Sequence, residues 1–343
     1  MINLAVPKWA YAYGGPSCSG DIKTIPEDFF VEEILSFQPE GSGEHVFLFI
    51  EKIGENTEYI ARLLARHAGV RQRDVSFAGL KDRHGRTRQW FSVWLPGKED
   101  PDWLALETDR LKILQTIRHT RKLKRGVLKG NHFELMIRNW QGHRDSIEQQ
   151  LIQIQQHGFP NYFGAQRFGH DGQNIGRALA LFQGGKVNRE QRSLYLSAAR
   201  SFLFNLILAE RVRQQNWHQA LPGDVFKLDG SNSLFANPAL DQSLLDRVER
   251  GDIHPTGALW GKGQTAISDT ALALEQKIIE SQPSLAEGLE KAGVEIDRRA
   301  LRAIPNHLSW QFESGADLRL IFDLPAGSYA TALLREIVRF DPR

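Results

Sequence analysis

The chain has 343 residues, of which 43 are basic and 41 acidic, and the resulting net charge of +2 excludes a strongly charged class of protein. Hydrophobic residues make up 41% and charged residues 24%, which is typical of a folded globular protein and not of a disordered one. At about twice the usual domain size, the chain is expected to form two domains or one enlarged domain.

The single cysteine, Cys18, excludes an internal disulfide, and no cysteine–histidine set has zinc-site spacing. Cys18 lies in a Gly/Pro/Ser-rich stretch, 14–20, that is typical of a flexible lead-in and gives poor support for a catalytic thiol. The N-terminal stretch lacks a secretion-signal pattern. The longest apolar-rich stretch, 194–208, contains Arg200 and Asn205 and is too short to span a bilayer. We therefore expect a reduced, cytoplasmic protein.

The first part of the chain mixes strand and helix patterns. Aromatic and β-branched residues predict a strand over 45–51. An apolar stripe at helical spacing, formed by Ile60, Leu63 and Leu64, predicts a helix over 57–67. Further strands are predicted at 75–78, 89–95 and 132–138, and a further helix at 146–156.

The middle of the chain, from about 160 to 300, is predicted to be mostly helical. Its expected helices are 193–214, 238–249 and 268–281, with glycine- and proline-rich turns at 254–257 and 261–263. Strand pattern returns over 318–324, and a turn at 325–327 leads into a closing helix over 329–339. This order of strands, helices and a final strand predicts a helical domain inserted into an α+β domain.

The polar loop over 79–87, between two of the predicted strands, is the most informative local feature. It places one carboxylate, Asp82, among four cationic side chains: Lys81, Arg83, Arg86 and Arg88. Nearby cations lower a carboxylate's pKa and keep it ionised. Asp82 is therefore a candidate covalent nucleophile. The residues alone also allow a solvated hairpin with ordinary surface ion pairs.

Basic residues gather in two further stretches. The first stretch contains six cations and no acidic residue: Arg118, Arg121, Lys122, Lys124, Arg125 and Lys129. The second contains four arginines: Arg62, Arg66, Arg71 and Arg73. Such clusters offer phosphate contacts, although a solvated basic face is the alternative for each. The interleaved aromatic residues favour RNA, whose exposed bases stack on such side chains. No phosphate-binding glycine loop, dinucleotide motif or metal-binding histidine pattern is present.

Six short blocks of the sequence are more specific than these general patterns: residues 22–33, 77–82, 129–133, 161–169, 196–205 and 324–331. Together and in this order they resemble the TruD family of tRNA pseudouridine synthases. The block Phe77–Asp82 is similar to the family's catalytic motif, and the resemblance extends from about residue 23 to residue 335. Two positions depart from the family's pattern: Ala258 stands where proline is expected, and Arg83 where lysine is common.

The resemblance implies a pseudouridine-synthase-type α+β fold, with a mixed, mainly antiparallel sheet and flanking helices. It implies a discontinuous catalytic domain of residues 1–156 and 306–343, whose C-terminal strand pairs with the N-terminal sheet, and an inserted, mainly helical domain of 157–305. The implied reaction is isomerisation of a tRNA uridine, at position 13 and chiefly in a glutamate tRNA. Asp82 is the implied nucleophile, and no cofactor, metal or obligatory protein partner is expected, so the enzyme should be a monomer.

The other expected site residues are Lys23, Phe29, Asn131, Phe133 and Tyr329. A uridine inside folded RNA must be extruded before a side chain can reach it. Asn131 and Phe133 share a face if one strand contains both, so Phe133 is expected to stack on the base while Asn131 bonds to its edge. Phe29 and Tyr329 are expected to close the pocket, and Lys23 to hold Asp82 or a phosphate. Core packing is the alternative for Phe29 and Phe133.

The sequence leaves the chemical route of Asp82 open. The carboxylate could add to carbon 6 of the base, attack carbon 1′ of the ribose, or assist loss of the base as a glycal. Two other functions compete with isomerisation. One is an RNA-binding protein without a reaction, which has no need for an anion among phosphate-seeking cations. The other is a metal-dependent nuclease, which requires several clustered carboxylates, whereas the basic loop contains only Asp82.

Overall fold

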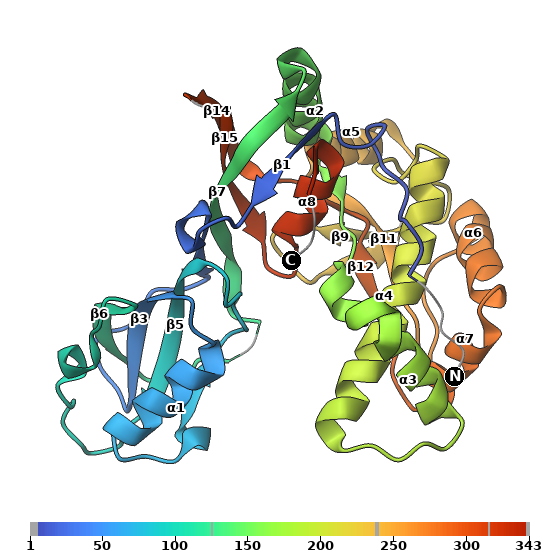
Figure 1. Cartoon of the computed structure of the whole chain (residues 1–343). Coiled ribbons are helices and arrows are strands. Elements are labelled where there is room, and N and C mark those ends of the chain that lie inside the picture. The colour runs from blue at the N-terminus through green and yellow to red at the C-terminus, as the bar shows by residue number, and fades with distance from the viewer. Residues whose placement is uncertain (1–5, 125, 237–239, 315, 341–343) are drawn as a thin grey trace. The chain divides into compact units, whose positions relative to one another are not determined.

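A computed structural model describes residues 6–124, 126–236, 240–314 and 316–340. The chain forms two compact units, and its helices and strands are coloured along the sequence in Figure 1. We name the first the sheet unit, made of Cys18–His143, Pro305–Gly327 and Arg339–Arg343. The second is the helix-rich unit, made of Met1–Ser17, Arg144–Ile304 and Ser328–Val338. The architecture is α+β, as predicted.

These compact units divide the chain at other residues than the expected domains, 1–156 with 306–343 and 157–305. By their contacts, α2 (Arg144–His157) and α8 (Ala330–Ile337) belong to the helix-rich unit. The expected division into a catalytic domain and an inserted domain stays a prediction.

A mixed sheet forms the body of the sheet unit. Hydrogen-bonded neighbours follow the order β14, β15, β7, β2, β5, β3, β6, with β1 beside β7 and β4 beside β5. Their bounds are β1 (Cys18–Ile22), β2 (Phe29–Leu35), β3 (His45–Ile53), β4 (Val75–Phe77), β5 (Arg86–Trp94), β6 (Leu111–His119), β7 (Leu128–Gly142), β14 (Asn306–Glu313) and β15 (Asp317–Pro325). These pairs are antiparallel except β2 with β5, which is parallel. Phe322 of β15 lies opposite Phe133 of β7, which confirms that the C-terminal strand joins the N-terminal sheet.

Helix α1 (Thr57–His67) covers one face of β3 and β5 (Figure 1). Its predicted apolar stripe is present: Ile60 and Leu64 pack with Leu48, Ile50 and Phe91, and these side chains are fully buried. The helical spacing in α1 therefore predicts its buried face correctly, because residues three and four apart lie on one face of a helix.

Helix α4 (Arg189–Arg213) is the centre of the helix-rich unit. It begins before the predicted residue 193 because Asn188 caps it: the Asn188 side chain accepts from the Gln191 amide, and the Gln191 side chain bonds back. The helices α3 (Gln173–Phe182), α6 (Asp269–Glu280) and α7 (Pro283–Lys291) contact α4. Helix α5 (Gln242–Arg250) begins after Asp241, whereas the predicted start at Pro238 lies outside the described residues.

A four-stranded sheet in this unit, in the order β10, β9, β11, β12, was not expected from the sequence. Its strands are β9 (Val225–Leu228), β10 (Leu234–Ala236), β11 (Ile253–Leu259) and β12 (Asp297–Ala300), and a smaller pair joins β8 (Phe159–Pro160) to β13 (Arg302–Ala303). The predicted turn at 254–257 is wrong, because these residues lie in β11. Pro255 is tolerated there because β11 pairs with β9 up to Pro255 and with β12 from Thr256, so the proline lies where the strand changes partners.

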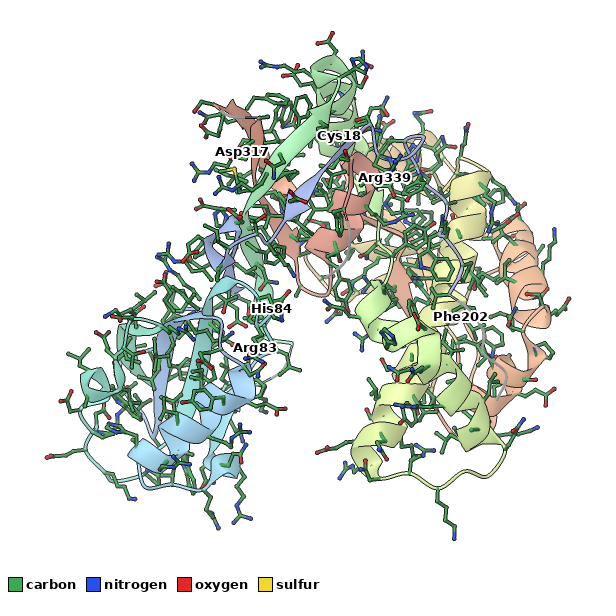
Figure 2. The ribbon with its side chains drawn as sticks, viewed as in Figure 1. Cys18, Arg83, His84, Phe202, Asp317 and Arg339 are labelled. Carbon is green, nitrogen blue, oxygen red and sulfur yellow. The ribbon has the colours of Figure 1, made fainter. Side chains whose placement is uncertain are left out.

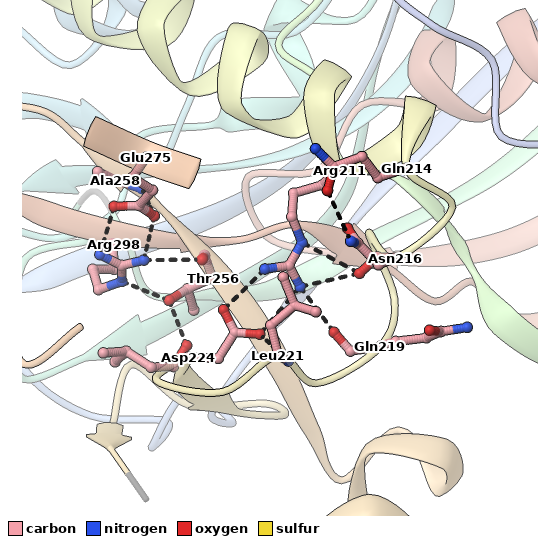
Figure 3. A network of polar contacts seen from close by, with 11 residues as sticks. Arg211, Gln214, Asn216, Gln219, Leu221, Asp224, Thr256, Ala258, Glu275 and Arg298 are labelled. Atoms are coloured by element: carbon pink, nitrogen blue, oxygen red, sulfur yellow. Dashed lines mark hydrogen bonds and ion pairs between the residues drawn. The ribbon is translucent and has the colours of Figure 1, made fainter. Parts of the chain in front are cut away.

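Buried arginine–carboxylate pairs lie in the interior of the helix-rich unit (Figure 3). Arg211 donates to Asp224 at 3.0 Å, and Arg298 donates to Glu275 at 2.6 Å. The amide of Ala258 donates to Glu275 at 3.2 Å. The proline expected at this position has no N–H to donate, so alanine supplies the buried carboxylate with a hydrogen bond that proline would remove.

Candidate active site

The loop between β4 and β5 contains Asp82, and the neighbouring Arg83 and His84 are labelled in Figure 2. Two hydrogen bonds hold the part of the loop that precedes Asp82. The amide of Lys81 donates to Oγ1 of Thr57 at 3.1 Å, and Gln89 donates to the carbonyl of Gly79 at 2.5 Å. A Cβ atom at Gly85 would lie 2.6 Å from the carbonyl oxygen of Phe29, so only glycine allows the loop to pass this close to β2.

Asp82 forms an ion pair with Lys23, and the amide of His84 donates to its Oδ1 at 3.0 Å. Burial opposes ionisation of the carboxyl group. The hydrogen bonds from Lys23 and His84, together with the Lys23 charge, outweigh burial and hold the pKa of Asp82 below its ordinary value. The Asp82 side chain is 24% exposed. Asp82 is therefore an ionised carboxylate that a ligand can reach.

Lys23 is held in an unusual backbone conformation, with φ at 57°. A non-glycine residue in the left-handed region costs energy and persists only where its surroundings fix it. Its ammonium group, besides pairing with Asp82, lies 4.2 Å from the centre of the Phe29 ring, in a cation–π contact. Of the two roles expected for Lys23, the structure shows the contact with Asp82.

Phe29 and Phe133 are both buried, at 6% exposure, and their rings meet edge to face with centroids 6.4 Å apart. Phe133 also stacks on Phe322 at 5.3 Å. This packing fits the core alternative as well as a ligand-binding ring, so the stacking role of Phe133 stays a prediction.

Asn131 and Phe133 lie on the same face of β7, because they are opposite Glu33 and Val31 of β2. Oδ1 of Asn131 is buried and has no hydrogen-bond partner among the described residues. A buried acceptor without a partner is costly. This oxygen is therefore, within the described part of the chain, an unsatisfied acceptor on the face of β7 that also carries Phe133.

Tyr329, the remaining expected site residue, belongs to the helix-rich unit. It precedes α8, and its ring lies 6.1 Å from that of Phe163. The structure thus brings Lys23, Phe29 and Asp82 into contact, with Phe133 packed on Phe29, and gives Tyr329 a separate set of neighbours in its own unit.

Two charged residues of the sheet unit, Glu33 and Lys52, were missed by the sequence analysis, which named Lys81 only as a cation near Asp82. Lys81 forms a buried ion pair with Glu33, with Nζ 2.7 Å from Oε1. Lys52 is fully buried, and its Nζ donates to the carbonyl of Glu55 at 2.7 Å. Burial and the nearby Lys81 charge lower the pKa of Lys52 to about 8. The signal for Lys52 is its spacing, because it lies two residues after Ile50 and so on the same face of β3.

The surroundings of two other residues named from the sequence, Cys18 and Arg118, indicate structural roles. Cys18 is buried, and burial raises the pKa of its thiol to about 11 against an opposing hydrogen bond from Trp140, which disfavours a thiolate nucleophile. In the basic stretch, Arg118 pairs with Asp100 and donates to the carbonyls of Gly43 and Leu95, so it has a structural role. Arg125 lies outside the described residues.

The sequence matches the family model described as tRNA pseudouridine synthase D (TruD), over residues 6–183 and 184–337. The chain belongs to the TruD family. Among curated proteins it is 50% identical over 334 residues to tRNA pseudouridine synthase D of Methylococcus capsulatus, covering 97% of this chain and 94% of that protein. It is 49% identical over 334 residues to the protein of the same name from Nitrosococcus oceani, covering 96% and 93%.

The TruD fold is also shared with a solved structure. A crystal structure described as a tRNA pseudouridine synthase D from Methanosarcina mazei superposes with a TM-score of 0.71 at 20% identity, covering 95% of both chains. The expected TruD-type α+β fold is thereby confirmed. Within the described residues, no helix is long and apolar enough to cross a membrane, and no group of three or more His, Cys, Asp or Glu side chains could hold a metal ion.

Proposed function

We propose that the protein is a tRNA pseudouridine synthase that isomerises uridine 13, chiefly in a glutamate tRNA, with Asp82 as its nucleophile. The observation that carries the proposal is the ionised, reachable Asp82 carboxylate held by Lys23 beside Phe29. Membership of the TruD family supports the reaction class.

The reaction needs little besides a positioned carboxylate. The bond between N1 and carbon 1′ breaks, a bond between carbon 5 and carbon 1′ forms, carbon 5 loses a proton and N1 gains one. The atoms balance without a further reactant, so no cofactor is proposed. Addition to carbon 6, attack at carbon 1′ and assisted glycal formation all require the same ionised oxygen, and the route among them stays open.

The neighbours of Asp82 suit an extruded base. Unpairing a base from folded RNA costs a few kcal/mol, which contacts in the pocket must offset. We propose that Oδ1 of Asn131 accepts a hydrogen bond from the N3–H of uracil, since this oxygen has no partner among the described residues. Phe29 and Phe133 would supply the aromatic surface, and the expected role of Tyr329 stays a prediction.

The test is to incubate the purified protein with unmodified glutamate tRNA and to map pseudouridine along the RNA. We expect one modified position, uridine 13, and no modification in a matched tRNA with cytidine at that position. Pseudouridine at another position would contradict uridine 13 as the target but would still support the isomerase reaction. Binding without any pseudouridine would contradict the reaction and favour an RNA-binding protein. A monomeric state, a cytoplasmic location and the catalytic and inserted domains stay predictions.

A further inference from the structure

Arg167 is the centre of a polar cluster in the helix-rich unit. It lies in the short turn Ala165–Phe168, and the residue is half-buried. Its Nη1 donates to Oγ of Ser197 on α4 at 3.1 Å, and its Nη2 donates to the hydroxyl of Tyr329 at 2.8 Å. The guanidinium also lies 5.5 Å from the centre of the Phe163 ring. Neutral groups from three separate segments therefore fix the position of a cation.

The charge of Arg167 is not compensated within the described part of the chain, where it forms no ion pair with a carboxylate. A second arginine contacts the same aromatic ring. The guanidinium of Arg299 lies 4.2 Å from the centre of the same Phe163 ring and donates to Oδ1 of Asn161 at 2.6 Å. Burial lowers the pKa of Arg299 to about 10, and Tyr329 opposes this shift while the charge of Arg167 adds to it. Arg167 and Arg299 thus place two guanidinium groups against Phe163.

A cavity in the same unit shares Arg299 with these contacts. A cavity of about 410 Å³ is lined by Arg299, Lys227 and Asn232, with Asp297 also on its wall. Burial and the charge of Arg299 lower the pKa of Lys227, although Asp297 and Asp229 oppose this. The cavity wall therefore carries the cations Lys227 and Arg299 together with the carboxylate of Asp297.

We propose that Arg167 binds a backbone phosphate of the RNA substrate, with Ser197 and Tyr329 as positioning residues. Guanidinium groups have five N–H donors in a planar fork that suits phosphate oxygens. The two hydroxyls use Nη1 and Nη2 and accept without neutralising the charge, so the cation is oriented for an incoming anion. This proposal deepens the proposed function, on which it rests for the RNA, and gives the Tyr329 hydroxyl a role other than closing the base pocket.

The test measures tRNA binding at several salt concentrations, in an Asp82→Asn background so that turnover does not change the ligand. Arg167→Gln is expected to weaken binding on the order of ten-fold, as for loss of one charge-assisted contact, and to reduce the slope of log Kd against log salt by about one. Arg167→Lys keeps the charge and should keep the slope while losing part of the affinity. Tyr329→Phe removes only the hydroxyl and should weaken binding less than Arg167→Gln does.

Arg250→Gln is the matched control, because Arg250 is an exposed arginine of the same unit that pairs with Asp252, and its loss should leave affinity and slope unchanged. Parent-like affinity and slope for Arg167→Gln would overturn the proposal. So would a loss of affinity in both Arg167 variants with an unchanged slope and a lower Tm, because that pattern shows a purely structural role. These readouts do not depend on catalysis, so a failure of the isomerase reaction is distinguishable from a failure of this proposal.

Discussion

Lys81→Met tests whether the buried ion pair with Glu33 holds the Asp82 loop in place. The Lys81 and Glu33 side chains are 9% and 0% exposed, so solvent screens their interaction little. Removing one partner of such a pair costs about 3–5 kcal/mol of unfolding free energy, because the other charge stays buried. At roughly 2–4 °C of Tm for each kcal/mol in a domain of 150–250 residues, we expect Tm to fall by roughly 10 °C.

The pH dependence of this loss follows from Glu33. Burial raises the pKa of Glu33, and Lys81 and the Trp90 amide oppose the rise. Without Lys81 the pKa rises further, so the folded protein keeps a proton that the unfolded chain releases. Stability is then greatest below the unfolded pKa and falls as pH rises through the folded pKa. Thermal unfolding of Lys81→Met should therefore show a deficit against the parent that grows from acidic to neutral pH.

Two further variants complete the experiment. The double variant Lys81→Met with Glu33→Gln removes the unpaired charge and should recover much of the lost stability. Lys112→Met is the matched control, because its pair with Glu107 in the same unit is exposed and such pairs contribute about 0–1 kcal/mol. Because Lys81 precedes Asp82, Lys81→Met should also lower the single-turnover rate at temperatures where it is folded. A parent-like Tm for Lys81→Met, or no recovery in the double variant, would refute the reasoning.

Three other predictions concern the reaction. Lys23→Met removes the main partner that keeps Asp82 ionised, so the acidic limb of the pH profile for single-turnover pseudouridine formation should move to higher pH, and an unmoved limb would contradict this role. Phe133→Ala should lose about 1–3 kcal/mol of base contact, seen as slower turnover at saturating tRNA, whereas Phe133→Tyr keeps most function; a parent rate with lower Tm would show that Phe133 is only a core residue. Activity should survive excess EDTA, and loss of activity that added Mg²⁺ restores, with the tRNA still folded, would show that a metal is required.

Sequence patterns predict the elements whose side chains alternate cleanly between buried and exposed. They predict β15 and α1 well for this reason, because β15 alternates strictly and α1 buries a single stripe. Strand β2 was not predicted, because its sequence contains Glu32 and Glu33 and so breaks the apolar alternation. Glu33 is buried only because Lys81, distant in the sequence, provides its counter-charge. In the same way, Pro255 suggested a turn, and only the change of strand partners in β11 makes it compatible with a strand.

Some residues of the candidate site could be predicted from the sequence, and others could not. The cationic loop identified Asp82 as a candidate, and the family resemblance added Lys23 and Phe29, which the structure brings into contact with each other and, through Lys23, with Asp82. Arg167 and the role of the Tyr329 hydroxyl were not predicted. Their contact joins residues from distant segments of the chain, and no local pattern encodes such a contact.

The most direct test of the central claim is single-turnover pseudouridine formation by Asp82→Asn at saturating glutamate tRNA. This substitution removes the charge and the attacking oxygen and leaves the shape of the side chain nearly unchanged. We expect the variant to keep the parent's Tm to within a few degrees and its affinity for tRNA, and to form no pseudouridine above the level without enzyme. Appreciable turnover by Asp82→Asn would contradict the assignment of Asp82 as the nucleophile.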